Sequence, residues 1–217
     1  MKLQLIVIGL LIILLLSTSA SGQSFSNEDC MMCHEDEELT MLVDDSVEVS
    51  IYVDIEKFSN SLHGGFECMD CHSNIEDLPH AEDLEHPDCN MCHEDAAEIY
   101  AGSIHGRTLE QGMKEAPYCW DCHTSHYVYP SDDSLSSVFI LNQPQTCGEC
   151  HSDQDLVEKF NIPISHPSEA YETSVHYQEA VQGNLNSASC SDCHGVHDLE
   201  PQINPDSKIN IFNIPQT

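Results

Sequence analysis

The chain has 217 residues, and its 38 acidic against 6 basic side chains give a formal net charge of −32 at pH 7. Nucleic acid is therefore not expected as a partner, because phosphate binding needs the opposite sign of charge. The acidic residues are spread along the chain, so we expect them to favour solubility, or function in salty surroundings that screen them. Attraction of a basic partner is the alternative.

Residues 1–22 have the features of a secretory signal peptide. A basic start is followed by the apolar stretch 3–16 and by small residues, with cleavage expected after Ala20 or Gly22. The apolar stretch has about 14 residues, fewer than the roughly 20 of a membrane span, although an uncleaved membrane anchor is the alternative. We therefore expect residues 23–217 to be exported, to the periplasm or to the extracellular space.

Apolar runs are few and short in the rest of the chain. Residues 47–53 (VEVSIYV) alternate in polarity, as an isolated strand or a hairpin arm does. Residues 94–102 and 166–176 are each expected to form one short helix, and proline and asparagine interrupt the remainder. These runs cannot build an ordinary protein core, so we expect a mostly irregular fold with short α-helices and little β-structure.

All 12 cysteines occur in C-x-x-C pairs, and a histidine follows each pair directly. The cysteines are Cys30, Cys33, Cys68, Cys71, Cys89, Cys92, Cys119, Cys122, Cys147, Cys150, Cys190 and Cys193. The histidines are His34, His72, His93, His123, His151 and His194. C-x-x-C-H is the attachment signature of haem c, in which two thiols bond to the haem and the histidine binds the iron. Zinc ribbons also use C-x-x-C, but they need no histidine at this position. We therefore predict six covalently attached haems that form the core of a hexahaem domain, residues 23–217.

An internal repeat relates residues 103–146 to residues 174–217, with matching residues 71 positions apart. Both copies contain an S-x-H element, a C-x-x-C-H motif that continues as CHxxH, and a final PQT. In the first copy the motif at Cys147 follows PQT at once, whereas in the second copy PQT ends the chain. This register predicts a chain truncated before a further C-x-x-C-H motif. A tail that lost its haem but kept a packing role is the alternative.

Eight histidines lie outside the motifs, and six of them would give every iron a second imidazole. The S-x-H elements supply His63, His105 and His176, the CHxxH elements supply His126 and His197, and His80 takes the equivalent place after His72. His86 and His166 each precede a proline and stay unassigned. Methionine is the rival ligand, with Met41 and Met113 as candidates. Bis-histidine ligation in acidic surroundings predicts low reduction potentials.

These elements resemble those of the multihaem c-type cytochromes, particularly the ones with doubled C-x-x-C-H repeats. The stretch CMDCHSNIEDLPHAEDLEHPDCNMCH (68–93), followed by SIHG and APYCWDCHTSH, is similar to the repeats of that family. The resemblance implies short helices and irregular chain around closely stacked haems. It also implies electron transfer between a quinol-side donor and a periplasmic or external acceptor.

We therefore expect a low-potential electron carrier that relays single electrons through six bis-histidine haems, and not an enzyme. Its expected partners are a redox protein donor and acceptor, with a membrane quinol dehydrogenase among the candidates, and self-assembly is left open. The first alternative is an oxidoreductase acting on a small nitrogen or sulfur compound, although no catalytic residue can be nominated. The others are the haem-bearing portion of a quinol dehydrogenase and an extracellular cytochrome filament.

Overall fold

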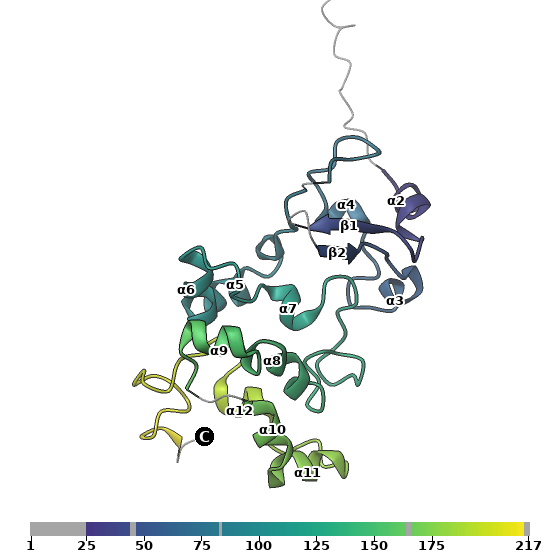
Figure 1. The fold of residues 1–217 in the computed structure, drawn as a ribbon. Coiled ribbons are helices and arrows are strands. Elements are labelled where there is room, and N and C mark those ends of the chain that lie inside the picture. Colours follow the sequence, from purple (N-terminus) through teal and green to yellow (C-terminus); the bar gives the residue numbers. More distant parts are fainter. Residues whose placement is uncertain (1–24, 44–46, 83, 164–165, 215–217) are drawn as a thin grey trace, which may run out of the picture.

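The computed structural model describes residues 25–43, 47–82, 84–163 and 166–214, and the predicted signal peptide lies outside these ranges. The described chain is a succession of short helices joined by loops, and it advances from one end of the molecule to the other (Figure 1). Its first elements are α2 (Asn27–His34), β1 (Thr40–Val43), β2 (Val47–Ser50), α3 (Ile55–Ser59), α4 (Cys68–Cys71), the 3₁₀ turn η1 (Cys89–Met91) and α5 (Glu94–Gly102). They are followed by α6 (Ile104–Glu110), α7 (Cys119–His123), α8 (Gln143–His151), α9 (Gln154–Phe160), α10 (Pro167–Glu172), α11 (Val175–Val181) and α12 (Cys190–His194). The expected fold class, short helices and irregular chain with little β-structure, is confirmed.

The β-structure of the described residues is one antiparallel hairpin of β1 and β2, which confirms the hairpin arm predicted at 47–53. The paired strand ends at Ser50, earlier than the alternating pattern does. Beyond it, the N–H of Val53 donates to the carbonyl of His34 at 2.7 Å. The chain therefore leaves the hairpin to pack against the end of α2.

The predicted helix 94–102 is α5, residue for residue, but the single helix expected over 166–176 is wrong. Helix α10 ends at Glu172, and a new helix, α11, begins at Val175. Ser174 separates them, because its hydroxyl accepts a hydrogen bond from the N–H of Tyr177 and so caps the second helix.

Three of the C-x-x-C-H motifs form a short helix that begins at the first cysteine, namely α4, α7 and α12. An aspartate stands between the two cysteines of each motif, at Asp70, Asp121 and Asp192. Its carboxylate accepts the N–H of the residue before the first cysteine, at 2.8, 2.6 and 2.7 Å respectively. This capping interaction holds the two thiols about one helical turn apart, with the histidine at the end of the turn.

The same contacts recur 71 residues apart in the two copies of the repeat. The hydroxyl of Tyr100 donates to the carbonyl of Pro117, and that of Tyr171 donates to the carbonyl of Ala188. The side-chain amide of Asn142 donates to the carbonyls of Ser134 and Ser136 at 2.9 and 2.8 Å. In the second copy, Asn213 donates to Pro205 and Ser207 at 2.7 and 2.9 Å. The loop after each motif helix is therefore fixed by the same polar contacts.

A short backbone contact joins two of the three S-x-H elements to the following unit. The N–H of Leu62 donates to the carbonyl of Val128 at 2.8 Å, and the N–H of Ile104 donates to the carbonyl of Leu199 at 2.8 Å. Both acceptors stand two residues after the last histidine of a CHxxH element. Arg107 adds a two-pronged ion pair with Glu200 at the second of these joints, at 2.7 and 2.8 Å. Successive units are thus attached end to end.

The described polypeptide has almost no apolar core of its own. Its buried apolar side chains are Met31, Ala116, Phe139 and Ala180. Protein packing alone therefore does not explain how these segments hold together.

Thr124 and Gly195 occupy the same place in the two copies, and they differ in strain. Thr124 has a φ of +66°, which is costly for a β-branched residue, and its buried hydroxyl lacks a partner among the described residues. Gly195 has a φ of +96° without that cost.

We predict that Thr124→Gly stabilises the matured protein by about 1 kcal/mol, because it removes the strain and the unpaired hydroxyl. Gly195→Thr should destabilise it by about 2 kcal/mol, since a Cβ there would lie 2.3 Å from Oδ1 of Asp198. Urea unfolding followed by circular dichroism measures both changes. Equal effects of the two substitutions would contradict the difference in strain between the two positions.

Candidate haem-binding sites

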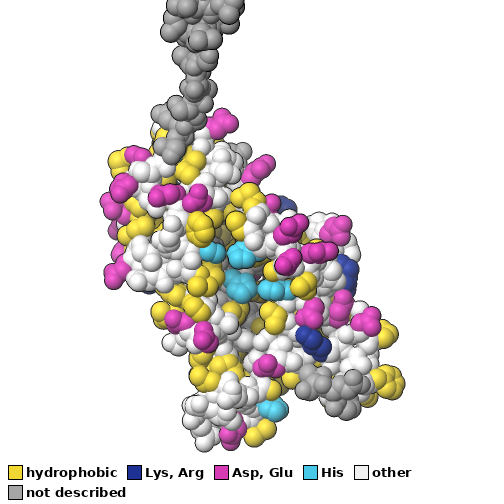
Figure 2. Space-filling model, turned by 180° about the vertical axis from the view of Figure 1, so that it is seen from behind, with side chains coloured by type: hydrophobic (Ala, Val, Ile, Leu, Met, Phe, Trp, Pro, Cys, Tyr) yellow, Lys and Arg dark blue, Asp and Glu magenta, His cyan; other side chains and the backbone are white. Residues whose placement is uncertain are grey.

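Ten of the histidines lie in pairs with nearly constant spacing. The ring centres are 6.0–6.1 Å apart in each pair. The pairs are His34–His80, His63–His93, His72–His126, His105–His151 and His123–His197. Each contains one motif histidine and one histidine from outside the motifs. Figure 2 shows histidine side chains gathered near the middle of one face, with acidic side chains around them.

The spacing of these pairs fits two ligands of one metal ion. A metal–imidazole bond is about 2 Å long and the ring centre lies about 1 Å further, so two rings on opposite sides of one ion are about 6 Å apart. Direct stacking gives a different geometry, as in Tyr118 and Trp120, whose parallel rings are 4.5 Å apart. The angle between the histidine rings varies from 8° to 55° while their distance hardly changes. If both rings bind one metal ion, the two bond lengths fix the distance between the ring centres. The angle between the ring planes can still vary, because each ring can turn about its bond to the metal.

Five of the paired rings have a lowered pKa, which favours the protonation state that binds a metal. Burial, with a smaller contribution from His151, lowers the pKa of His105 to about 4. Burial likewise lowers the pKa values of His72, His123, His126 and His151. A lowered pKa keeps the imidazole neutral at pH 7, so a ring nitrogen retains its lone pair for a metal.

The first pair shows how the backbone orients the rings. Nδ1 of His34 lies 2.8 Å from the carbonyl of Ile51, and Nδ1 of His80 lies 2.8 Å from the carbonyl of Ala81. A carbonyl can only accept, so each Nδ1 carries the proton and each Nε2 is the available ligand atom. The planes of the two rings differ by 8°, and the backbone carbonyls of Ile51 and Ala81 hold the rings in this orientation.

The partners follow a rule that spacing alone does not reveal. An S-x-H histidine faces the second motif histidine after it in the sequence: His63 faces His93, and His105 faces His151. A CHxxH histidine instead faces back to the preceding unit, as His197 faces His123.

Four histidines lie outside these pairs. His86 stacks on Trp120 with ring centres 4.8 Å apart, and His166 lies 4.0 Å from the carboxylate of Glu169. His176 and His194 have no ring contact within the described residues, and both are exposed. His86 and His166, left unassigned from the sequence, are thus outside the histidine pairs, and the ligand role of His176 stays a prediction.

The cysteines of successive motifs approach one another in sequence order. All of them are free thiols. Burial and the neighbouring Cys30 raise the pKa of Cys68, and burial and Cys119 raise that of Cys89. A hydrogen bond with Cys190, together with burial, raises the pKa of Cys147. First cysteines therefore meet between motifs one and two, three and four, and five and six.

Second cysteines make the remaining connections. Burial, followed by Asp70 and Cys92, raises the pKa of Cys71, which places motif two beside motif three. Burial and the nearby Cys147 raise the pKa of Cys122 to about 11, which places motif four beside motif five. All six motifs form one series in the order of the sequence.

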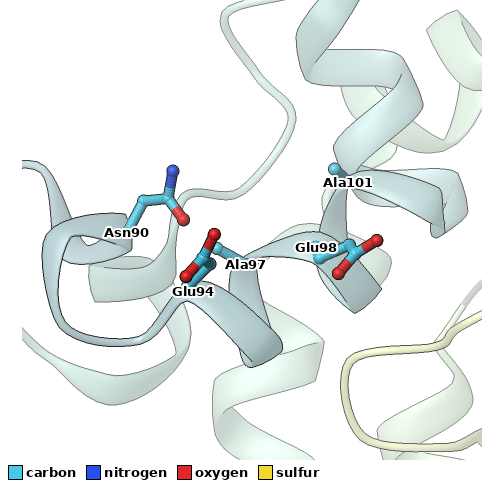
Figure 3. Close-up of a pocket in the computed structure, with 5 residues that line it drawn as sticks. All are labelled: Asn90, Glu94, Ala97, Glu98 and Ala101. Carbon is cyan, nitrogen blue, oxygen red and sulfur yellow. The ribbon is translucent and has the colours of Figure 1, made fainter.

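Two open pockets lie along α5. One, of about 360 Å³, is lined by Asn90, Glu94, Ala97, Glu98 and Ala101, and its carboxylates come from one side of the helix (Figure 3). It contains neither histidine nor cysteine. The other, of about 400 Å³, includes Cys92 and His93 and so adjoins the His63–His93 pair. The second pocket is therefore the one next to a candidate haem site.

The motif turns and the paired imidazoles define the class of protein as a multihaem c-type cytochrome. Residues 60–152 match the family model of cytochrome c3. This part of the chain, with four C-x-x-C-H motifs, is thus similar to a family of multihaem electron-transfer proteins, which confirms the resemblance seen in the sequence. No solved structure matches the chain significantly. None of the described helices is long and apolar enough to cross a membrane.

We predict that His105→Ala adds one high-spin haem per chain to the oxidised protein. The iron that His151 would bind loses its second imidazole in this variant. His86→Ala is the matched control and should leave the spin state unchanged, since its ring packs on an aromatic pair. Electron paramagnetic resonance of both variants measures the change. An unchanged spectrum for His105→Ala would contradict the assignment.

Proposed function

We propose that this multihaem cytochrome carries six haems in bis-histidine coordination and passes single electrons along them at low potential. The observation that carries the proposal is the set of five histidine pairs with a common spacing of 6.0–6.1 Å. The twelve cysteines and six motif histidines named above would hold the haems. His63, His80, His105, His126 and His197 would supply the second ligands, and His176 stays a candidate.

The chain's own part in electron transfer is to fix spacing and order. Haem supplies an iron that takes up and releases one electron when it is bound. The thiol contacts support a linear order, because each motif touches the next one along the sequence. First cysteines meet at three of the five junctions. The second cysteines Cys71 and Cys92 are neighbours at the junction of motifs two and three, and Cys122 lies near Cys147 at the junction of motifs four and five. An electron entering at one end would thus cross five short steps to reach the other.

Low potential follows from the ligands and the charge. Two neutral imidazoles stabilise ferric iron better than an imidazole and a thioether do. The net charge of −32 adds to this, because negative surroundings favour the more positive oxidation state. The candidate methionines do not compete in this geometry, since Met41 lies in the hairpin and Met113 is exposed.

Electron transfer without substrate chemistry remains the function that this arrangement favours. The pockets on α5 present the carboxylates of Glu94, Asp95 and Glu98 to solvent. An oxidoreductase role, a quinol dehydrogenase and a filament stay alternatives. We propose an exported protein, periplasmic or extracellular, with residues 1–22 as its signal peptide and redox proteins as donor and acceptor.

The first test is the intact mass of the protein matured in a host that attaches haem c. We expect the mass of residues after the cleavage site plus six haems. Spectropotentiometric titration should then place most haems well below about +100 mV, as bis-histidine ligation requires. Fewer haems, or most potentials above that value, would reject the proposal.

A single ligand change tests the pairing and the potential together. We predict that His63→Met raises the potential of one haem by roughly 100 mV or more, because methionine in place of histidine favours ferrous iron. His166→Met is the control and should shift none. A shift in neither variant would show that His63 is not a ligand.

A further inference from the structure

The first cysteines divide the six motifs into three groups of two. A hydrogen bond between thiols joins the first cysteine of one motif to the first cysteine of the next. We call two motifs joined in this way a doublet. The doublets are motifs one and two (Cys30 and Cys68), motifs three and four (Cys89 and Cys119), and motifs five and six (Cys147 and Cys190).

The histidines agree with this division. In each doublet a histidine of one site lies near a histidine of the other site. Burial lowers the pKa of one of the two, and the neighbouring histidine lowers that pKa further. The neighbours are His34 and His126, His93 and His123, and His194 and His151.

One side chain next to the first motif reaches into the second motif. Asn27 is half-buried and stands three residues before Cys30, at the first position of α2. Its Oδ1 accepts the N–H of Cys68 at 2.7 Å, although the two residues are 41 positions apart. That N–H belongs to the first turn of α4, where a helix cannot supply an acceptor. Asn27 thus ties α2 to the motif turn of its doublet partner.

Gln143 makes the corresponding contact in the third doublet. It is half-buried and stands four residues before Cys147, at the first position of α8. Its Oε1 accepts the N–H of Ser191, and its Nε2 donates to the Ser191 hydroxyl, both at 3.1 Å. Ser191 is the second residue of α12, so this N–H is again a free donor of a first turn.

An aromatic contact takes the same place in the middle doublet. His86 stands three residues before the third motif, and its ring stacks on Trp120 with centres 4.8 Å apart. The ring of Tyr118 lies 6.4 Å from that of His86. Tyr118 and Trp120 flank Cys119, where α7 begins. His86 therefore reaches the first turn that an amide side chain reaches in the other two doublets.

The junction of motifs four and five is tied in another way, through the loop between them. The hydroxyl of Ser137 donates to the carbonyl of Cys122, and its carbonyl accepts the hydroxyl of Thr146 at 2.7 Å. The two motifs are thus linked through a third segment. Inside the doublets, a side chain next to one motif touches the turn of the other directly.

We propose that Asn27, His86 and Gln143 are positioning residues that fix the distance between the two haems of each doublet. These haems would be bonded to first cysteines that lie in contact, so a shift of one motif turn would change the separation of the two irons. Electron exchange depends on orbital overlap, which falls steeply with separation. The three residues would thus make exchange faster inside a doublet than between doublets. The inference rests on the proposed haem content.

Electron paramagnetic resonance of the matured, fully oxidised protein tests Gln143, because two neighbouring ferric irons broaden and shift each other's signals. We expect Gln143→Ala to change the signals of two haems per chain and to leave every haem low-spin. Gln145→Ala is the matched control, since Gln145 is an exposed glutamine of the same helix, and it should change none. A change confined to one haem, or no change, would overturn the role of Gln143 between the motifs.

A shorter side chain keeps this test decisive if the alanine variant loses haem. Gln143→Asn retains the amide but ends one methylene short of Ser191, so it should change the signals of the same two haems. A spectrum identical to that of the wild type would overturn the proposal for this doublet.

Two substitutions of Asn27 separate its hydrogen bond from its volume. Aspartate keeps the oxygen that accepts the N–H of Cys68, so Asn27→Asp should retain the wild-type spectrum. Asn27→Ala should change two haems, and its combination with Gln143→Ala should change four, because the two residues act on separate doublets. Equal spectra of Asn27→Asp and Asn27→Ala would contradict the hydrogen bond.

His86 is tested in the same way. Phenylalanine can stack on Trp120 but cannot bind iron, so His86→Phe should resemble the wild type, whereas His86→Ala should change two low-spin signals. A high-spin haem in His86→Phe would make His86 a ligand and overturn its positioning role. Intact mass separates the two proposals, because fewer than six haems in the wild type would reject the proposed function. Six haems with spectra that no alanine variant changes would reject this inference alone.

Discussion

In the proposed bis-histidine coordination, a metal ion shared by two imidazoles would be the interaction on which this fold depends. Each pair joins segments far apart in the sequence, as His34 and His80 or His123 and His197 do. Bringing such segments together costs chain entropy, and the few buried apolar side chains offset little of it. Ligand bonds across each haem, with two thioether bonds on one side, would act as cross-links at these points. Binding and folding are then one process.

The lengths of the helices agree with this view. Helices α3, α4, α7 and α12 have 5, 4, 5 and 5 residues, far below the length at which a helix is stable in water. Capping aspartates stabilise the motif turns, but one cap contributes only about 1 kcal/mol. The thiols and the histidine at the ends of each turn would be fixed to one rigid haem. The bonds from these side chains to the haem would thus fix the turn. The backbone would then form the short helix that matches the distance between the two thiols.

The sequence predicted the local chemistry well and the partners poorly. Helix α5 and the hairpin follow from composition, while the break at Ser174 was missed because a capping serine resembles any polar residue in a helical stretch. The histidines outside the motifs could be selected by their register. The motif histidine that each of them faces could not be predicted. That partner lies in another unit, and the spacing along the sequence does not tell whether it is the preceding or the following one. The apolar residues after CHxxH, Val128 and Leu199, were the overlooked signal of the backbone contact between units.

Two of the few basic residues form ion pairs that orient neighbouring segments and add little stability. Arg107 pairs with Glu200 across the joint between the two copies, and Lys159 of α9 pairs at 2.5 Å with Glu115, which lies in the loop before α7. Both pairs are partly exposed, so each contributes at most about 1 kcal/mol. They cannot offset the mutual repulsion of a chain with charge −32. A protein held by such pairs would expand as salt is removed, whereas one held by ligand bonds keeps its spacing. An acidic surface would therefore be compatible with closely spaced sites, because the proposed cross-links join each unit to its neighbour.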